Sequence, residues 1–351
     1  MRILALDLGA GWRGGQKQTA LVSAALAARG HDVVLLATAG SALAREMAGP
    51  SGRSLTVVEI PAGSEASPRL LSAVARATRL AAPSVLWSSD ARGHGAAVWS
   101  RAAARAPLVV HRRVTFPPGR DPLSRLKYRA ARRYVAISRE VGRALGAAGV
   151  PEERITVIPD GLPPEAYVGR RAPDGPPFHL VHVGAFDGMK GQEVAVRALS
   201  RLVARGLDAT LTLLGDGPAR AIAERIASAE GVAARCVFTG EVRDVAESLA
   251  ASHLFLLPSR SEGAALSLAE AMAAGCPALV HDLPGPREFC RDGTCGALVP
   301  SLDPEAWGEA AARLLLDPAE RSRLSAAGRA AAAGWTLEES VARLEAVLEA
   351  A

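Results

Sequence analysis

Two kinds of hydrophobic pattern alternate along the chain, and the alternation predicts a parallel β-sheet. Short apolar runs rich in β-branched residues are separated by longer Ala- and Leu-rich stretches whose apolar positions recur with the period of a helix. This order is typical of β–α units. The expected strands form a first series (2–7, 32–37, 84–88, 108–111, 134–137 and 156–158) and a second series (178–183, 209–214, 236–239, 254–257, 278–281 and 297–299).

The two series predict two domains. A length of 351 residues exceeds the roughly 250–300 at which one hydrophobic core stops growing. Residues 161–177 are rich in Pro and Gly, so we expect a domain linker without regular structure there. We predict an α/β protein with domains over 1–165 and 166–335 and a ligand cleft between them. The tail, 336–351, opens with a capping-box pattern and is expected to form a helix that returns to the first domain.

The net charge of +5 conceals a strongly basic stretch. Residues 101–133 hold ten Lys or Arg side chains and one acid, Asp121. Such a stretch forms a solvated face, or it binds an anionic acceptor or anionic lipid headgroups, and a peripheral membrane contact is one of these alternatives. Interleaved aromatic residues and a base-reading module are absent, so we expect no nucleic-acid partner.

Other features of the composition favour a soluble cytoplasmic protein, with the inner membrane surface as an alternative location. No apolar run approaches the ~20 residues that span a bilayer. The apolar part of the first nine residues is too short for a secretory signal. The four cysteines show no C-x-x-C pairing and no neighbouring His cluster, so reduced thiols are expected rather than a metal site.

A glycine-rich turn follows the first expected strand. Gly14 and Gly15 precede a helical pattern, where free amides attract phosphate and a missing Cβ permits close approach of a ligand. Packing between strand and helix explains such glycines equally well. No acid clearly ends the second expected strand, which counts against a nicotinamide dehydrogenase.

Two further segments of the second half carry candidate chemistry. Lys190 and Gly191 stand where a helix is expected to begin, and a lysine there suits a phosphate, although a plain surface lysine is the alternative. Glu262 and Glu270 are separated by seven residues. If the helix starts at Ala264, then Glu262 lies just before it and Glu270 about two turns inside, roughly 10 Å away. The amides of the first helical turn would favour a departing anion.

The string SEGAALSLAEAMAAGCP resembles the E-x7-E segment of retaining glycosyltransferase family 4, whose members have the GT-B fold of two Rossmann-like domains with parallel sheets facing a central cleft. The likeness extends over most of the chain. GGQKQTALVSAALAARGHDVVLL, VAISREVGRALGAAGVPEERITVIPDG, LLGDGPAR and VFTGEVRDVAESLAASHLFLLPS also resemble segments of that family, and they occur in its order.

The resemblance implies a donor site for a nucleotide diphosphate sugar. It implies that Lys190 binds the diphosphate, Glu262 the hydroxyls of the transferred sugar, and Glu270 the ribose. The amides of Leu266 and Ser267 would hold phosphate, and the segment Gly240, Glu241 and Val242 would border the base. The remaining positions that the resemblance places near the donor are Gly14, Gly15, Gly184, Gly263, Ala264 and Ala265.

The sequence departs from the family pattern at two positions. Ala185 stands where the family often has a phosphate-binding Arg, and Asp160 replaces the usual Asn before Gly161. The family also places a His of its first domain near the sugar. His111 and Asp90 are the candidates for such a role here, with Arg113 and His94 as alternatives, and each has a structural explanation of similar weight.

The resemblance suggests front-face transfer with retention, in cell-envelope, polysaccharide or glycolipid biosynthesis, to a glycan or lipid-linked acceptor. No D-x-D occurs, so we expect no metal ion and no cofactor. One alternative is an epimerase or phosphorylase on the same fold, although the lysine environment that a pyridoxal phosphorylase needs is not found. The other is a non-catalytic nucleotide-sugar-binding protein, for which Ala185 is the best support.

Overall fold

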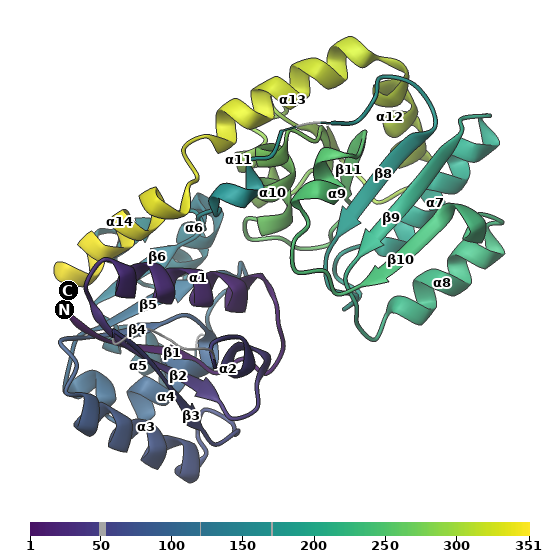
Figure 1. The fold of residues 1–351 in the computed structure, drawn as a ribbon. Helices are drawn as coiled ribbons and strands as arrows, with labels where there is room; N and C mark the ends of the chain where they lie inside the picture. The colour runs from purple at the N-terminus through teal and green to yellow at the C-terminus, as the bar shows by residue number, and fades with distance from the viewer. Residues whose placement is uncertain (49–53, 120, 170) are drawn as a thin grey trace. The chain divides into compact units, whose positions relative to one another are not determined.

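The chain forms two compact units (Figure 1). The computed structural model describes residues 1–48, 54–119, 121–169 and 171–351. Unit 1 comprises Met1–Gly161 and Leu337–Ala351, and unit 2 comprises Leu162–Thr336. The division after Gly161 falls four residues before the boundary that the sequence predicted. Among the described residues, no helix is both long and apolar enough to cross a bilayer.

The described residues after Gly161 are mostly irregular up to β8 (Phe178–Val183), as we predicted, but they are part of a compact unit rather than a separate linker. They belong to unit 2 and include a 3-10 turn, Pro164–Ala166, for which the fixed φ of Pro164 is suited. The Leu162 amide donates to the Trp335 carbonyl oxygen at 2.7 Å, and the Tyr167 hydroxyl donates to the Ala332 carbonyl oxygen at 3.0 Å. These two hydrogen bonds attach the segment to the end of unit 2. Arg170, within this segment, lies outside the described residues.

Unit 1 contains a seven-stranded parallel sheet in the order β3-β2-β1-β4-β5-β6-β7. Its strands are β1 (Arg2–Asp7), β2 (Asp32–Thr38), β3 (Leu55–Ile60), β4 (Val85–Ser88), β5 (Leu108–Arg112), β6 (Arg133–Ala136) and β7 (Ile155–Val157). The sequence prediction missed β3. This edge strand is only half-buried and contains exposed Thr56 and Glu59, so it lacks the continuous apolar run of a central parallel strand.

The C-terminal helix completes the core of unit 1, although almost the whole chain separates it from the first strand. Val341, Leu344 and Leu348 of α14 (Leu337–Glu349) are buried in the same cluster as β1 and α1. Glu345 accepts from the side chain of Arg29 at 2.8 Å. The other helices of unit 1 are α1 (Gly14–Ala28), α2 (Ala42–Glu46), α3 (Pro68–Ala81), α4 (Ala91–Trp99), α5 (Pro122–Ala130) and α6 (Arg139–Ala147).

Unit 2 contains a six-stranded parallel sheet in the order β10-β9-β8-β11-β12-β13. Its strands are β8 (Phe178–Val183), β9 (Ala209–Leu214), β10 (Cys236–Gly240), β11 (Leu254–Leu257), β12 (Ala278–His281) and β13 (Ala297–Val299). Its helices are α7 (Gln192–Ala204), α8 (Arg220–Ala229), α9 (Ala246–Ala250), α10 (Leu266–Ala274), α11 (Pro284–Phe289), α12 (Pro304–Leu316) and α13 (Pro318–Ala332). The four cysteines, all in this unit, are free thiols.

The same topological feature occurs in both sheets. In unit 1 the chain builds from β1 outward through β2 and β3, and then crosses to the other side of β1 to form β4. In unit 2 it builds from β8 through β9 and β10, and then crosses to form β11. In open parallel sheets, ligands bind beyond the carboxyl ends of the strands where the order reverses in this way. The fold therefore directs attention to the loops after β1 and β4, and after β8 and β11.

Candidate functional site

In unit 2, the loops after β8 and β11 meet in an ion pair. The Lys190 ammonium donates to Glu262 Oε1 at 2.6 Å, and the Ser259 hydroxyl donates to the same oxygen at 2.8 Å. The Glu262 side chain is 6% exposed, whereas that of Lys190 is 26% exposed. The structure thus brings together two candidates that lie 72 residues apart in the sequence. The Lys190 amine therefore remains partly accessible beside the buried, hydrogen-bonded carboxylate of Glu262.

Glycines allow these two loops to approach closely. Gly191 has φ of +70°, and a Cβ there would lie 2.0 Å from the Pro258 carbonyl oxygen. At Gly184, a Cβ would lie 3.1 Å from Lys190 Cγ. The Arg260 amide also donates to the Met189 carbonyl oxygen at 2.8 Å. Close packing, against the Pro258 backbone at Gly191 and against the Lys190 side chain at Gly184, therefore explains the two glycines that flank the lysine turn.

Helix α10 begins two residues later than we predicted. Ala265 is its N-cap residue and has φ of +51°, so Ala264 and Ala265 lie outside the helix. Glu270 is consequently the fifth helical residue, about one turn from the start rather than two. The difference arises because alanine has a strong helical propensity, and sequence patterns do not reveal a left-handed residue at a helix start.

The first turn of α10 offers amides to an anion. Within the part of the chain that the structure describes, neither the Leu266 amide nor the Ser267 amide donates a hydrogen bond to another residue. Gly263 lies under α11, where a Cβ on Gly285 would come within 2.6 Å of its carbonyl oxygen. Glu270 is 7% exposed. The amino end of α10 therefore offers two backbone amides to an anion, and the nearly buried Glu270 carboxylate lies further along the same helix.

Gly240 ends β10 in a left-handed conformation, with φ of +77°. Its carbonyl oxygen accepts from the Gly215 amide at 2.8 Å, which joins the ends of β9 and β10. Glu241 and Val242, the next two residues, are exposed. The segment that the resemblance assigns to the base is thus held by one backbone hydrogen bond and presents its following side chains to solvent.

A histidine that the sequence analysis did not single out underlies the lysine turn. His182 is fully buried at the end of β8, and its Nδ1 donates to the Leu256 carbonyl oxygen at 2.9 Å. Burial lowers its pKa to about 4, and the charge of Lys190 acts in the same direction. The ring is therefore neutral at neutral pH, and a second positive charge does not compete with Lys190 for an anion. Its position at a strand end was the only available sequence signal.

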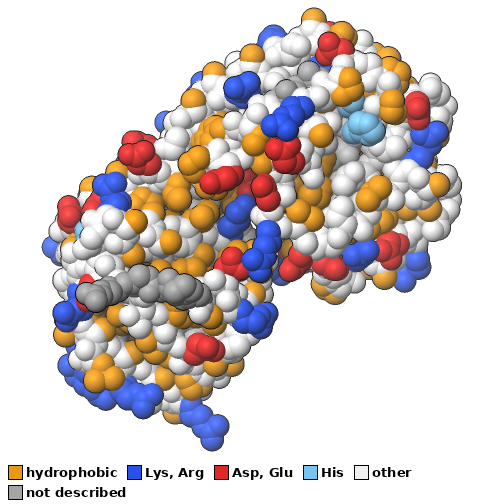
Figure 2. Space-filling view, viewed as in Figure 1, with side chains coloured by type: hydrophobic (Ala, Val, Ile, Leu, Met, Phe, Trp, Pro, Cys, Tyr) orange, Lys and Arg blue, Asp and Glu red, His pale blue; other side chains and the backbone are white. Residues whose placement is uncertain are grey.

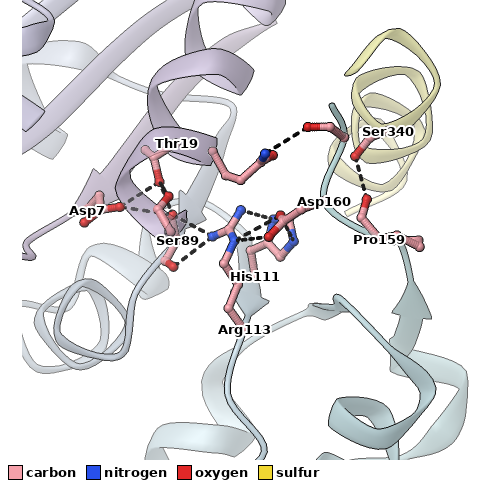
Figure 3. Close-up of polar contacts among 11 residues, drawn as sticks. Asp7, Thr19, Ser89, His111, Arg113, Pro159, Asp160 and Ser340 are labelled. Carbon is pink, nitrogen blue, oxygen red and sulfur yellow. Dashed lines mark hydrogen bonds and ion pairs between the residues drawn. The ribbon is translucent and has the colours of Figure 1, made fainter. Parts of the chain in front are cut away.

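In unit 1, buried Asp7 receives hydrogen bonds from α1 and from the loop after β4 (Figure 3). The Thr19 hydroxyl donates to its Oδ2 at 2.6 Å and the Ser89 hydroxyl at 3.2 Å, while the Gln16 amide donates to Oδ1 at 2.9 Å. From the sequence we predicted Asp7 only as the end of a strand. An acid directly before the glycine-rich turn was the signal that could have identified it.

Arg113 connects this network to Asp160 (Figure 3). Its Nε donates to the Asp160 oxygens at 3.0 and 3.1 Å, and its Nη1 donates to the Ser89 carbonyl and hydroxyl oxygens. The two candidate glycines, Gly14 and Gly15, are the first two residues of α1. A Cβ on Gly15 would lie 3.8 Å from Arg113 Cδ. Burial raises the pKa of Asp160, and Arg113 opposes that effect. Asp160, which replaces the usual Asn of the family, is therefore paired with the guanidinium of Arg113 in the same unit.

The hydrogen bonds of Arg113 also determine the tautomer of His111. Arg113 Nη2 donates to His111 Nδ1 at 3.3 Å, and a guanidinium can only donate. Burial and the nearby Arg113 charge hold the His111 pKa well below its usual range, so the ring is neutral and carries its proton on Nε2. That nitrogen is 3.8 Å from Asp160 Oδ1 and is buried without a hydrogen-bond partner among the described residues. His111 is itself only 3% exposed.

The alternative candidate His94 has a packing role in this structure. Its ring contacts Tyr128 edge-on at 5.0 Å between centroids, and its Nε2 lies 3.1 Å from the Lys127 carbonyl oxygen. Burial lowers its pKa to about 3. A neutral, enclosed imidazole between two helices does not face the loops that carry the other candidates.

Asp90 joins the loops after β1 and β4. Its Oδ1 caps α4 by accepting from the Gly93 amide at 2.8 Å and also accepts from the Leu8 amide at 3.2 Å. Burial, together with the charge of Asp7, raises its pKa to about 6. A cavity of about 460 Å³ lies against it, lined by Ser64, Glu65, Asp90, Ala91 and Arg92.

The raised pKa of Asp90 predicts a pH-dependent stability. Between its unfolded value near 3.8 and its folded value of about 6, the folded state retains a proton that the unfolded chain releases. The contribution of Asp90 to the free energy of unfolding therefore falls as pH rises through this window. We expect the stability of Asp90→Asn relative to the wild type to increase by about 1–3 kcal/mol between about pH 4 and pH 7. Urea unfolding at several pH values measures this difference, and a pH-independent difference would contradict the assignment.

Two family models match the chain. The model described as Glycosyl transferase 4-like domain matches residues 13–161, and the model described as Glycosyl transferases group 1 matches residues 167–331. The chain is 32% identical over 148 residues to alpha-D-kanosaminyltransferase of Streptomyces kanamyceticus, covering 42% of this chain and 38% of that protein. It is 35% identical over 160 residues to a GDP-mannose-dependent phosphatidylinositol monomannoside mannosyltransferase of Mycolicibacterium smegmatis, covering 42% and 40%. The alignments thus span less than half of either relative.

Solved structures share the fold over the full chain. HepE of Anabaena, solved in complex with UDP, superposes with a TM-score of 0.83, 18% identity and 100% coverage of both chains. Sucrose-phosphate synthase of Thermosynechococcus elongatus gives a TM-score of 0.81 at 19% identity, covering 99% of this chain and 98% of that one. The predicted fold class is confirmed, because the two parallel-sheet α/β units define a protein of the GT-B class. With both family models matched, the chain belongs to glycosyltransferase family 4.

Proposed function

We propose that this protein transfers a glycosyl unit from a nucleotide diphosphate sugar to an acceptor hydroxyl, with retention of anomeric configuration. The observation that carries the proposal is the Lys190–Glu262 pair, at the reversal point of the unit 2 sheet and on the loop that leads into α10. A partly accessible ammonium and two amides without partners among the described residues provide donors for a diphosphate. The family to which the chain belongs supports the same reaction class.

In the proposed reaction, the bond between the anomeric carbon and the β-phosphate oxygen breaks, and the nucleoside diphosphate leaves with the electron pair. The acceptor oxygen forms the new bond on the same face, and its proton passes to the departing phosphate. Lys190 and the Leu266 and Ser267 amides stabilise the developing negative charge. Once a diphosphate engages Lys190, Glu262 Oε1 becomes available to the hydroxyls of the sugar. Glu270 is proposed to receive the ribose hydroxyls.

The finer features of the proposal rest on the resemblance and on relatives. We propose metal-independent transfer without a cofactor in cell-envelope, polysaccharide or glycolipid biosynthesis, with a glycan or lipid-linked acceptor. The name of the Mycolicibacterium relative specifies a phosphatidylinositol monomannoside, which supports a lipid-linked acceptor. No group of three or more His, Cys, Asp or Glu side chains that could hold a metal ion occurs within residues 1–48, 54–119, 121–169 and 171–351.

A nucleotide panel provides the first test. We expect one of UDP, GDP or ADP to raise the thermal midpoint selectively, and its sugar derivative to support transfer in the presence of a chelator. The coupling constant of the anomeric proton in the product would then report retention. Absence of a nucleotide response at saturating concentration would favour the non-catalytic alternative, and an inverted product would contradict the retaining mechanism.

A further inference from the structure

Exposed hydrophobic side chains are concentrated in one short stretch of unit 1. Among the described residues, ten large hydrophobic side chains are exposed, and four of them fall between residues 114 and 126. They are Val114 at 42%, Phe116 at 60%, Leu123 at 66% and Leu126 at 55% exposure. Single exposed apolar residues are ordinary on a protein surface, but a cluster of this kind marks an interaction site.

Helix α5 presents two of these side chains on its outer side. None of its nine residues is buried. The helix is anchored by Tyr128, which packs against His94 and stacks on Tyr134 at 6.0 Å between ring centroids, and by Lys127, which donates to the Ala91 carbonyl oxygen at 3.0 Å. Leu123 and Leu126 are three residues apart and therefore lie on one side of the helix, away from Tyr128. Lys127, four residues after Leu123, lies on the same side as the leucines. The helix rests on unit 1 through polar and aromatic contacts and leaves an apolar stripe exposed.

The charge around this stripe is mainly positive. Arg125, Arg129 and Arg132 are exposed. Within residues 101–133 the one acid is Asp121, and its carboxylate is occupied in capping α5 through the Ser124 amide at 3.0 Å. Helix α4 packs against both α5 and α3, and Figure 2 shows basic side chains gathered over α3 as well. An approaching anionic surface would meet a positive field on this side of unit 1.

The basic surface is smaller than the ten cations of the sequence suggest. Arg112 is buried against Tyr128, with 2.6 Å between Nη1 and the hydroxyl oxygen, and Arg113 belongs to the Asp160 network. Lys127 pairs with Glu65 at 2.5 Å. Arg120 lies outside the described residues. We define the docking face by the three exposed cations within and just after α5 (Arg125, Arg129 and Arg132) and by three exposed apolar side chains (Phe116, Leu123 and Leu126).

We infer that this docking face binds the surface of an anionic lipid bilayer. Leucines and a phenylalanine beside arginines on one short surface are the combination that lies at the boundary between headgroups and acyl chains, where apolar side chains enter and guanidinium groups meet phosphates. A nucleic acid would not require the exposed leucines. The inference goes beyond the proposed transfer reaction and does not depend on it.

Vesicle binding by the full chain tests this inference. We expect the protein to sediment with vesicles containing phosphatidylglycerol and to bind vesicles of phosphatidylcholine alone far more weakly. Added salt should weaken the binding, because exposed charges are screened. The double variant Leu123→Ser/Leu126→Ser should lose about tenfold in affinity for anionic vesicles. Arg125→Gln/Arg129→Gln should lose a similar factor and show a smaller salt dependence.

Leu316→Ser is the matched control, because Leu316 of α12 is 67% exposed in unit 2. This variant should bind as the wild type does. The thermal midpoints of all variants establish that they are folded, and little change is expected for side chains this exposed. Equal binding to neutral and anionic vesicles, unchanged binding of the leucine double variant, or an equal loss in the Leu316 control would each overturn the inference.

Discussion

Replacing Lys190 by alanine is expected to lower kcat/KM for sugar transfer by about 100-fold or more, because this side chain stabilises the leaving diphosphate in the proposed reaction. Nucleotide-dependent thermal stabilisation should weaken in parallel. The α10 amides would remain, so binding is reduced rather than abolished. Initial rates at varied donor concentration, together with thermal shifts across the nucleotide panel, measure both effects.

The control for this variant separates chemistry from folding. Both Lys190 and Ser259 donate to the Glu262 carboxylate, which is 6% exposed. Lys190→Ala removes the first of these donors and leaves the Ser259 hydroxyl. A nearly buried carboxylate that has lost its cation destabilises the folded state, whereas Glu262→Gln in the same chain removes the charge. The double variant should therefore regain stability, and it should not regain transfer, because it lacks both Lys190 and the Glu262 carboxylate proposed to bind the sugar. Recovery of transfer along with stability would mean that Lys190 serves only to neutralise Glu262.

Arg113→Ala is expected to lower the free energy of unfolding of unit 1 by about 3–5 kcal/mol. The substitution removes both hydrogen bonds to Asp160 and those to Ser89, and it leaves a carboxylate whose side chain is 11% exposed. Because burial already raises the Asp160 pKa, protonation should reduce the cost as pH falls. Urea unfolding followed by tryptophan fluorescence measures the loss, since Trp12, Trp87 and Trp99 all lie in unit 1.

The matched variant is Arg113→Ala with Asp160→Asn. Asparagine keeps the size of the side chain but carries no charge, so more than half of the lost stability should return. If the double variant were as unstable as Arg113→Ala alone, the loss would come from the cavity or from Ser89 rather than from the unpaired acid. Comparison of the single and double variants therefore tests whether Arg113 stabilises unit 1 by neutralising the charge of Asp160.

Much of the fold was predictable from local patterns. Buried parallel strands need continuous apolar runs, and for this reason twelve of the thirteen strands lie close to their predicted positions. The exception, β3, is a half-exposed edge strand, where that requirement is relaxed. The expected return of the C-terminal helix to the first domain also matches the structure, in which α14 belongs to unit 1. Its apolar face could not be buried without a partner.

The candidate site was predictable in part. Lys190, Glu262 and Glu270 were identified because their loop and helix contexts are local and match a family pattern. The start of α10 was placed too early because alanines conceal the left-handed Ala265. Asp7 and His182 were missed, since a polar residue at a strand end has no distinctive local signal. Arg113 was named only as an alternative, without its link to Asp160.

The sequence by itself determined the class of fold, the order of its strands along the chain, and a set of candidate site residues, because each depends on short-range hydrophobic periodicity or on a local motif. Tertiary structure alone decided which of those residues meet. Lys190 contacts Glu262 across 72 residues, and Arg113 contacts Asp160 across 47. The reason is physical, since the first contact forms where the strand order of the unit 2 sheet reverses and the second joins the loops after β5 and β7, and strand order is set by packing between distant segments.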